Sequence, residues 1–274
     1  MTTTLSFGCG NDRRGGAASP DGSVSSADAS DRDADGSADG MQPVFCGTGF
    51  EWSGFRGCRT TVESLDVKFF PLEAGRPVER LVLHFHGDGA NTWDSNQAFD
   101  PEILQWAAER NYLVLGFLAT SMREAGDGLR PAYGTAQPEN AEEVVVGVET
   151  FLDRYAVVNR QSLYWGVSGG SWFFTSSYIP AVGHRVPGIF VANCGGSGTS
   201  FGWNWVPTGR PDVVEQIALY ANYGDQDFLA ERSRESIEEY DSMGFVTDEL
   251  VHEGATHCAH PIAGPTLAFW ERHL

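Results

Sequence analysis

The sequence lacks any apolar run long enough to cross a membrane, and it is poor in positive charge. A membrane-spanning helix needs about 20 consecutive, predominantly apolar residues, and no stretch of the 274 residues approaches this. Only 18 Lys and Arg residues stand against 37 Asp and Glu residues, so the formal net charge is -19. Nucleic acid and anionic membranes would repel such a surface. We therefore expect neither as a partner, and solubility alone is a sufficient reason for the acidity.

The first 40 residues lack the apolar side chains that a folded core requires. Residues 11–40 consist almost wholly of Gly, Ser, Ala, Asp and Arg, which is typical of a disordered tether. Their run DRDADG imitates the first half of a calcium-binding loop, but Gln42 stands where such a loop needs a bidentate glutamate. We expect an acidic tether over residues 1–40, one folded domain over residues 41–274, and no metal ion or cofactor.

Cys9 lies in the segment MTTTLSFGCG, which is similar to the end of a bacterial lipoprotein signal. In such a signal a small residue, here Gly8, precedes the cysteine that receives the lipid. A basic n-region and a full apolar stretch are missing, however. Two interpretations stay open: the signal is truncated, or the likeness is accidental. On the first, a lipid on Cys9 would attach the protein to the cell envelope.

The other four cysteines allow three pairings. Cys46 and Cys58 bracket a short loop, whereas Cys194 ends one expected strand and Cys258 follows another. We expect two disulfides and a secreted or cell-envelope protein, because disulfides persist in oxidising compartments. Free buried thiols are the alternative.

The rest of the chain alternates segments of strand and helix pattern. We expect strands over residues 62–70, 80–86, 112–119, 162–167, 187–194, 215–224 and 244–254. We expect helices over residues 99–111, 138–156, 229–243 and 264–274. Such alternation is typical of an α/β fold, with a mostly parallel sheet covered by helices on both faces. The nearly continuous apolar run RLVLHFH indicates a buried central strand.

The pattern G-x-S-x-G occurs twice, around Ser168 and around Ser200. Between a strand and a helix, this pattern makes a sharp turn that exposes the serine hydroxyl. Ser168 directly follows the strand SLYWGV and precedes a stretch free of Pro and Gly beyond the turn itself. Ser200 lies in a Gly-rich loop, and Pro207 prevents a regular helix after it. Ser168 is therefore the candidate nucleophile.

A serine nucleophile needs a base to take its proton and an acid to orient that base. In chains of this pattern the acid follows the serine, and the histidine comes last. His257 lies after the last expected strand, with His260 as the second candidate and His252 as a more distant one. Asp225 and Asp227 both follow the strand EQIALYANYG, and either could instead cap the next turn.

The oxyanion that develops during such a reaction needs two N–H donors. The backbone of Gly169, directly after the candidate nucleophile, supplies one. The loop HFHGDGANTW after the central strand supplies the other, from Asp88 or, failing that, from Gly89. A tight glycine-rich connection is the alternative interpretation of this loop.

The motifs HFHGDG, GVSGGS, GDQD and ATHC, taken in order, make residues 60–274 resemble the α/β-hydrolase superfamily. Within it, the chain is similar to secreted bacterial serine esterases of the poly(hydroxyalkanoate) depolymerase and feruloyl esterase kind. The resemblance implies an α/β-hydrolase fold with little or no lid. It also implies a catalytic triad of Ser168, Asp227 and His257, because the acid of such sequences is the third residue after the glycine corresponding to Gly224.

One departure concerns the cysteines. Tannase-like members of the superfamily bridge a cysteine before the serine to one after the histidine. Here Cys258 follows His257, but Val167 precedes Ser168. If Cys258 is bridged, the resemblance leaves Cys194 as its partner.

The resemblance implies a carboxylic ester hydrolase that acts on a small-molecule or polymeric ester. We also expect a monomer. A peptidase of the same superfamily and a non-catalytic binding protein on this scaffold are the alternatives. The interval 195–212, where lids usually insert, is short, so we expect an open site. Tryptophans near the expected site could line a substrate pocket or simply pack the loops; they are Trp93, Trp172, Trp203 and Trp205.

Overall fold

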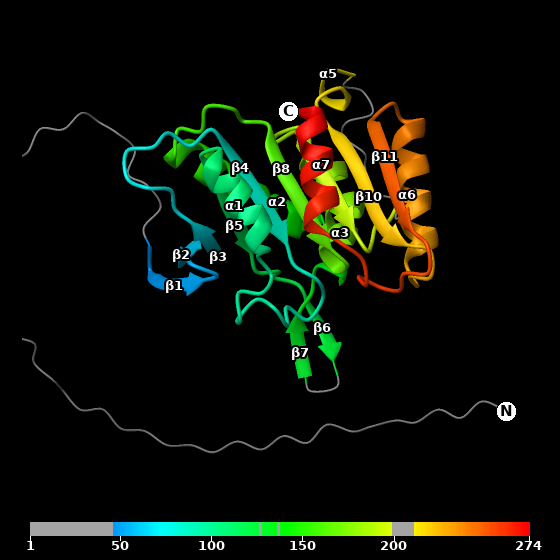
Figure 1. Ribbon diagram of the computed structural model, residues 1–274, viewed down its shortest axis with the longest axis horizontal. Coiled ribbons are helices and arrows are strands. Elements are labelled where there is room, and N and C mark those ends of the chain that lie inside the picture. The colour runs from blue at the N-terminus through cyan, green and yellow to red at the C-terminus, as the bar shows by residue number, and fades with distance from the viewer. Residues whose placement is uncertain (1–45, 126–127, 136–137, 199–210) are drawn as a thin grey trace, which may run out of the picture. The chain divides into compact units, whose positions relative to one another are not determined.

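A nine-stranded sheet runs through the protein, whose computed structural model describes residues 46–125, 128–135, 138–198 and 211–274 (Figure 1). The tether expected over residues 1–40 lies outside the described residues. From one edge of the sheet to the other, the strands are β1 (Thr48–Trp52), β2 (Phe55–Val62), β3 (Leu65–Phe70), β5 (Tyr112–Phe117), β4 (Arg80–Phe85), β8 (Ser162–Val167), β9 (Gly188–Asn193), β10 (Ala218–Gly224) and β11 (Val246–His252).

Antiparallel pairing is confined to one side of the sheet. The pairs β1–β2, β2–β3 and β3–β5 are antiparallel, and every pair from β5 through β4 to β11 is parallel. Every residue of β4, β9 and β10 is buried, as expected for strands covered on both faces. β11, at the edge, is largely exposed.

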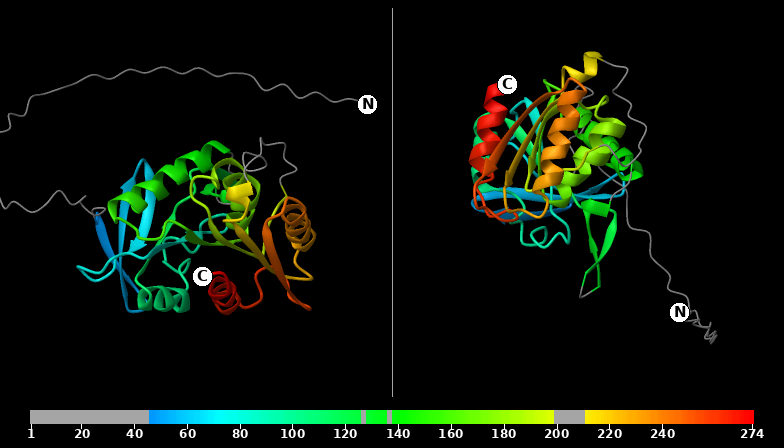
Figure 2. Two further views of the ribbon diagram at one scale, coloured as in Figure 1. Left: turned by 90° about the horizontal axis from the view of Figure 1, so that it is seen from above. Right: turned by 90° about the vertical axis from the view of Figure 1, so that its right-hand side faces the viewer.

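Helices cover both faces of the sheet (Figure 2). One face carries α1 (Pro101–Glu109) and α7 (Ala263–His273), which pack into one apolar cluster. The apolar cluster on the other face includes side chains from α2 (Pro138–Arg154), α3 (Gly169–Phe173), the π-helix η2 (Phe174–Tyr178), α4 (Ile179–Val182) and α6 (Ala230–Ser242). None of the helices in the described ranges is long and apolar enough to cross a membrane.

Two short hairpins differ from the expected elements. The strand expected over residues 62–70 is split, because Glu63 and Ser64 both have positive φ and form the two-residue turn between β2 and β3. A second hairpin, β6 (Met122–Ala125) with β7 (Gly128–Pro131), follows β5 and projects beyond the ends of the parallel strands (Figure 1). The short helices η1 (Tyr133–Thr135) and α5 (Pro211–Val214) complete the described elements.

Lys68, the only lysine in the chain, is buried in the middle of the sheet. Its ammonium donates to the carbonyl of Trp93 and to Asn96 Oδ1, the latter at 2.7 Å. It also lies over the rings of Phe50 and Trp93, and burial lowers its pKa. Lys68 therefore holds the loop that follows β4 against strand β3.

His86, directly after β4, is buried as a neutral imidazole. Its Nε2 accepts the backbone N–H of Ala119 at 3.0 Å, so its proton lies on Nδ1, which donates to the carbonyl of Gly87 at 2.7 Å. A second proton would break the bond from Ala119. Burial accordingly lowers the pKa of His86 to about 4.

We expect acid to destabilise the fold between about pH 6.5 and pH 4 because of His86. Its pKa is about 6.5 in an unfolded chain and about 4 in the folded protein. The unfolded chain therefore binds a proton that the folded chain excludes, and stability that is complete above about pH 6.5 is lost as the pH falls. The expected loss is roughly 3 kcal/mol near pH 4.

Urea unfolding at about pH 7 and pH 4.5 measures this loss. The variant His86→Asn should be less stable at neutral pH but should lose less between the two conditions. An equal loss in parent and variant would show that other groups carry the acid sensitivity.

Candidate active site

Ser168 lies in a sharp turn between β8 and α3, with φ 52° and ψ -114°. The two glycines of G-x-S-x-G are needed because the turn brings backbones together. A Cβ on Gly166 would lie 2.6 Å from the backbone nitrogen of Ser171, and one on Gly170 would collide with the carbonyl of Phe85. The glycines thus let the helix begin against the neighbouring strands, and the strained turn presents the Ser168 hydroxyl.

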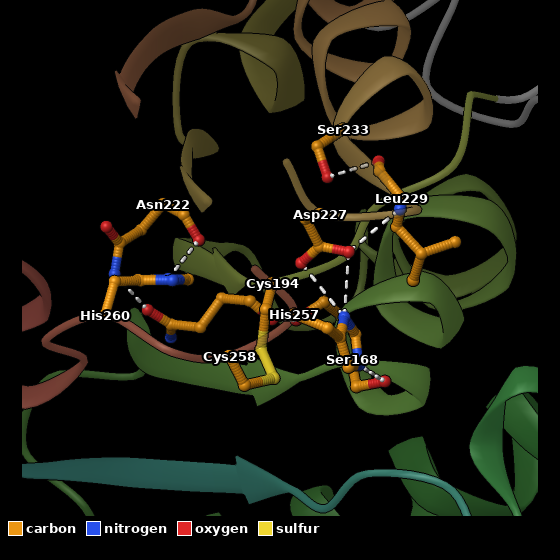
Figure 3. A network of polar contacts seen from close by, with 11 residues as sticks. Ser168, Cys194, Asn222, Asp227, Leu229, Ser233, His257, Cys258 and His260 are labelled. Atoms are coloured by element: carbon orange, nitrogen blue, oxygen red, sulfur yellow. Dashed lines mark hydrogen bonds and ion pairs between the residues drawn. A yellow bond between two sulfur atoms is a disulfide. The ribbon is translucent and has the colours of Figure 1, made fainter. Parts of the chain in front are cut away.

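Ser168, His257 and Asp227 form a continuous chain of hydrogen bonds (Figure 3). His257 Nε2 lies 2.9 Å from Ser168 Oγ, and His257 Nδ1 lies 2.9 Å from each carboxylate oxygen of Asp227. The Asp227 side chain is fully buried, and its Oδ1 also accepts the N–H of Leu229 at 2.8 Å. A buried carboxylate at Nδ1 keeps the proton there, so Nε2 faces Ser168 as an acceptor.

The parallel sheet explains why these three residues meet. Ser168 follows β8, Asp227 follows β10, and His257 follows β11. The carboxyl ends of parallel strands lie at one edge of the sheet, so the three loops are neighbours there.

The competing acid and histidines have other partners. Asp225 Oδ1 accepts the N–H of Gly254 at 2.7 Å and so caps the loop after β11. His252 Nε2 lies 2.7 Å from Asn222 Oδ1, and His260 Nε2 lies 3.1 Å from the carbonyl of Asn222. These two imidazoles stack on one another with 4.7 Å between ring centroids. Ser200 lies outside the described residues.

Two disulfides join the expected cysteines, Cys46 to Cys58 and Cys194 to Cys258. The second fixes the loop that carries His257 to the end of β9. Cys194 also donates its N–H to the carbonyl of Asn222 at 2.8 Å. In the described ranges, the three side chains grouped closely enough to hold a metal ion are Cys194, His257 and Cys258. Because the sulfurs of Cys194 and Cys258 are bonded to each other, the two cysteines offer no thiolate ligands.

We expect Cys258→Ser to lower both the melting temperature and the turnover number. Loss of a native disulfide typically costs about 2–5 kcal/mol, and a displacement of about 1 Å in a catalytic group can cost about a hundredfold in rate. Thermal unfolding and ester hydrolysis, each with and without reductant, measure the two effects. Reductant should mimic the substitution in the parent protein and have less effect on the variant.

Cys46→Ser is the matched control, because Cys46 precedes β1, at the opposite edge of the sheet from β11. It should lower stability without a comparable loss of turnover. Equal losses of turnover in the two variants would mean that the Cys194–Cys258 bridge does not position His257.

The loop after β4 lies beside Ser168, where a second oxyanion donor is required. A Cβ on Gly87 would lie 3.6 Å from Ser168 Cβ. Within the described part of the chain, the N–H groups of Asp88 and Gly169 donate to no acceptor. Gly89, the second candidate, donates instead to the carbonyl of Pro131 at 2.9 Å. Asp88 and Gly169 thus remain the candidates for the oxyanion hole.

The Asp88 carboxylate has a structural use that the sequence did not indicate. It accepts the N–H of Gly134 at 2.7 Å and pairs with Arg123 of β6 at 3.0 Å. A Cβ on Gly169 would collide with it. The carboxylate therefore fixes the loop after β4 against the hairpin and η1 and lies against Gly169, and Arg123 offsets its charge.

The four tryptophans proposed for the substrate pocket fare differently. Trp93 is only 1% exposed and packs on His86 and Phe99 in the core, so it does not line a surface site. Trp172, in α3, is partly buried, and its backbone N–H donates to the carbonyl of Ser168. Trp203 and Trp205 lie outside the described residues.

Phe228 is an aromatic residue at the site that the sequence did not single out. It directly follows Asp227, is 76% exposed, and its ring centroid lies 4.4 Å from that of His257. Its position next to the candidate acid is the signal that could have found it.

No family model matches the chain, and no curated protein sequence matches it. Several solved structures do. Esterase PE8 gives a TM-score of 0.52 at 14% identity, covering 76% of this chain and 98% of that one. TT1662 from Thermus thermophilus gives a TM-score of 0.51 at 21% identity, covering 80% of this chain and 97% of that one. Est1E from Butyrivibrio proteoclasticus gives a TM-score of 0.50 at 12% identity, covering 79% of this chain and 97% of that one. The chain therefore has the α/β-hydrolase fold.

Proposed function

We propose that the protein is a serine hydrolase that cleaves carboxylic esters through an acyl-enzyme. The observation that carries the proposal is the unbroken chain of contacts from Asp227 through His257 to Ser168 Oγ. A serine hydroxyl bonded to an imidazole, which is bonded in turn to a buried carboxylate, is the arrangement that activates serine for attack. The names of several structural neighbours, esterase PE8 and Est1E among them, support an ester as the substrate.

Acylation begins when His257 Nε2 takes the proton of Ser168 and Oγ attacks the ester carbonyl carbon. The carbonyl oxygen becomes an oxyanion, which the N–H groups of Gly169 and Asp88 would stabilise. His257 then gives its proton to the alcohol oxygen, the carbon–oxygen bond breaks, and the alcohol leaves. Asp227 stays ionised and stabilises the imidazolium throughout.

Deacylation repeats these steps with water. His257 takes a proton from the water as its oxygen attacks the acyl carbon, and then returns a proton to Ser168 Oγ as the acid departs. Ser168, His257 and Asp227 thus end in the states in which they began.

The surroundings of the protein are part of the proposal. The two disulfides support a secreted or cell-envelope location, because such bonds persist outside reducing compartments. The net charge of -19 supports an uncharged or cationic ester, small or polymeric, and disfavours nucleic acid and anionic membrane as partners. We further propose that the protein acts as a monomer.

Labelling with a fluorophosphonate tests the proposal directly. Intact mass should increase by one adduct, and peptide mapping should place it on Ser168. Hydrolysis should then be measured on acyl esters of increasing chain length, aryl esters, polyester films and peptide amides. Turnover of esters with little turnover of amides supports the proposal. A protein that takes no label and cleaves neither class would be a binding protein on a hydrolase scaffold.

A further inference from the structure

Phe228 stands out because a large apolar ring is exposed at the candidate active site. Its 76% exposure exceeds that of the other exposed large hydrophobic side chains in the described ranges. Most apolar surface on a protein needs no functional explanation. Phe228 differs in that its ring lies against His257, with 4.4 Å between ring centroids and 39° between the ring planes.

Hydrogen bonds hold the backbone on either side of Phe228 in a turn. Asp227 donates its N–H to the carbonyl of Gly224 at 3.2 Å, and its own carbonyl accepts the N–H of Ala230 at 2.9 Å. Leu229 donates its N–H to Asp227 Oδ1 at 2.8 Å. The turn that presents the acid to His257 therefore also presents the next side chain at the surface beside that histidine.

The chemistry of His257 indicates which part of an ester would lie near Phe228. His257 Nε2 lies 2.9 Å from Ser168 Oγ, and in the proposed reaction the same nitrogen protonates the departing alcohol oxygen. The alcohol must therefore lie on the His257 side of Ser168. The carbonyl oxygen lies on the other side, toward Gly169 and Asp88. Phe228 accordingly borders the alcohol part of the substrate.

We propose that Phe228 is a specificity-determining residue that contacts the alcohol part of the ester and favours flat, apolar alcohols such as arylmethanols. This inference rests on the proposed ester hydrolysis. An exposed aromatic ring offers such a group an offset or edge-to-face contact and loses water-exposed surface when the group binds. The acyl part of the substrate lies away from Phe228 and is unaffected by it.

The test compares benzyl acetate with methyl acetate in the parent and in Phe228→Ala. The two alcohols are of similar acidity, so their intrinsic leaving abilities are close. Both esters give the same acetyl-enzyme, so the deacylation rate is common to both. Because kcat/KM reports acylation alone, it registers a contact with the alcohol whichever step limits kcat. We expect the benzyl-to-methyl ratio of kcat/KM to fall about tenfold in the variant.

Two controls separate this role from a general one. Leu129→Ala removes another exposed apolar side chain, from β7, and should leave the ratio unchanged. Methyl esters of acetate, butyrate and hexanoate should keep their relative kcat/KM in Phe228→Ala. Phe228→Tyr, which retains the ring, should keep most of the benzyl preference.

Three outcomes would overturn the inference. An equal loss for both acetates would mean that Phe228 acts on His257 itself. A change confined to the acyl series would place the ring on the other side of the substrate. An unchanged benzyl-to-methyl ratio would show that Phe228 does not contact the alcohol part of the substrate. In all three cases the parent still hydrolyses esters. If the proposed function is wrong, the parent hydrolyses no ester at all.

Discussion

Replacing Ser168 with alanine is expected to lower kcat for ester hydrolysis by roughly five to six orders of magnitude. In serine hydrolases, loss of the nucleophile removes the covalent route, and only binding and oxyanion stabilisation remain. Ser168 Oγ is the atom that His257 Nε2 contacts at 2.9 Å, so the alanine removes the hydroxyl that this imidazole would activate. Steady-state hydrolysis of a chromogenic ester measures the loss, and fluorophosphonate labelling should vanish with it.

Ser200→Ala is the matched control, because Ser200 lies in the other G-x-S-x-G match of the sequence. It should keep both activity and labelling. Labelling that persisted in Ser168→Ala and disappeared in Ser200→Ala would transfer the role of nucleophile to Ser200.

Asp227→Asn should produce the second largest loss, roughly four orders of magnitude in kcat. An amide in this place can donate to Nδ1, and the imidazole proton then moves to Nε2, which faces Ser168. His257 would then lack the lone pair with which it takes the serine proton. Single-turnover acylation measured over a range of pH gives the size of the effect.

Asp225→Asn tests whether this loss is specific to the acid. Asp225 uses Oδ1 to accept the N–H of Gly254, and an asparagine keeps a carbonyl oxygen for that bond. We expect a mild effect. Comparable losses in the two variants would indicate that neither carboxylate orients His257.

Local signals in the sequence predicted the central part of the fold. The apolar run of β4 and the strand, turn and glycines around Ser168 are confirmed nearly to the residue, as is the amphipathic helix α2. The hairpin β6–β7 could not be predicted, because its short strands carry no apolar alternation and are held largely by pairing with each other. β1 was missed for another reason: the segment between Cys46 and Cys58 was interpreted as a loop, although its alternating Phe50 and Trp52 pack against an apolar cluster.

The candidate site, like the fold, could be predicted only in part from local sequence signals. Chain order and loop position indicated Ser168 and His257, the resemblance chose Asp227 over Asp225, and the structure brings these three together. Trp93 was proposed for the substrate pocket because it lies near the expected site, with packing of the loops as the alternative, and its ring turns inward onto Phe99. Such packing depends on contacts distant along the chain, which no local pattern records. The use of the Asp88 carboxylate depends in the same way on the unpredicted hairpin.

Because Lys68 is the only lysine, cleavage after it can be used to detect unfolding of the protein. It lies in the middle of β3, paired on one side with Arg59 and on the other with Gly116, and is 3% exposed. A lysine-specific protease can therefore cut only molecules that have opened the sheet, and a single cut yields residues 1–68 and 69–274. Each disulfide lies within one fragment, so the halves separate on a gel without reductant. Brief proteolysis thus counts unfolded molecules in any mixture, with no label attached.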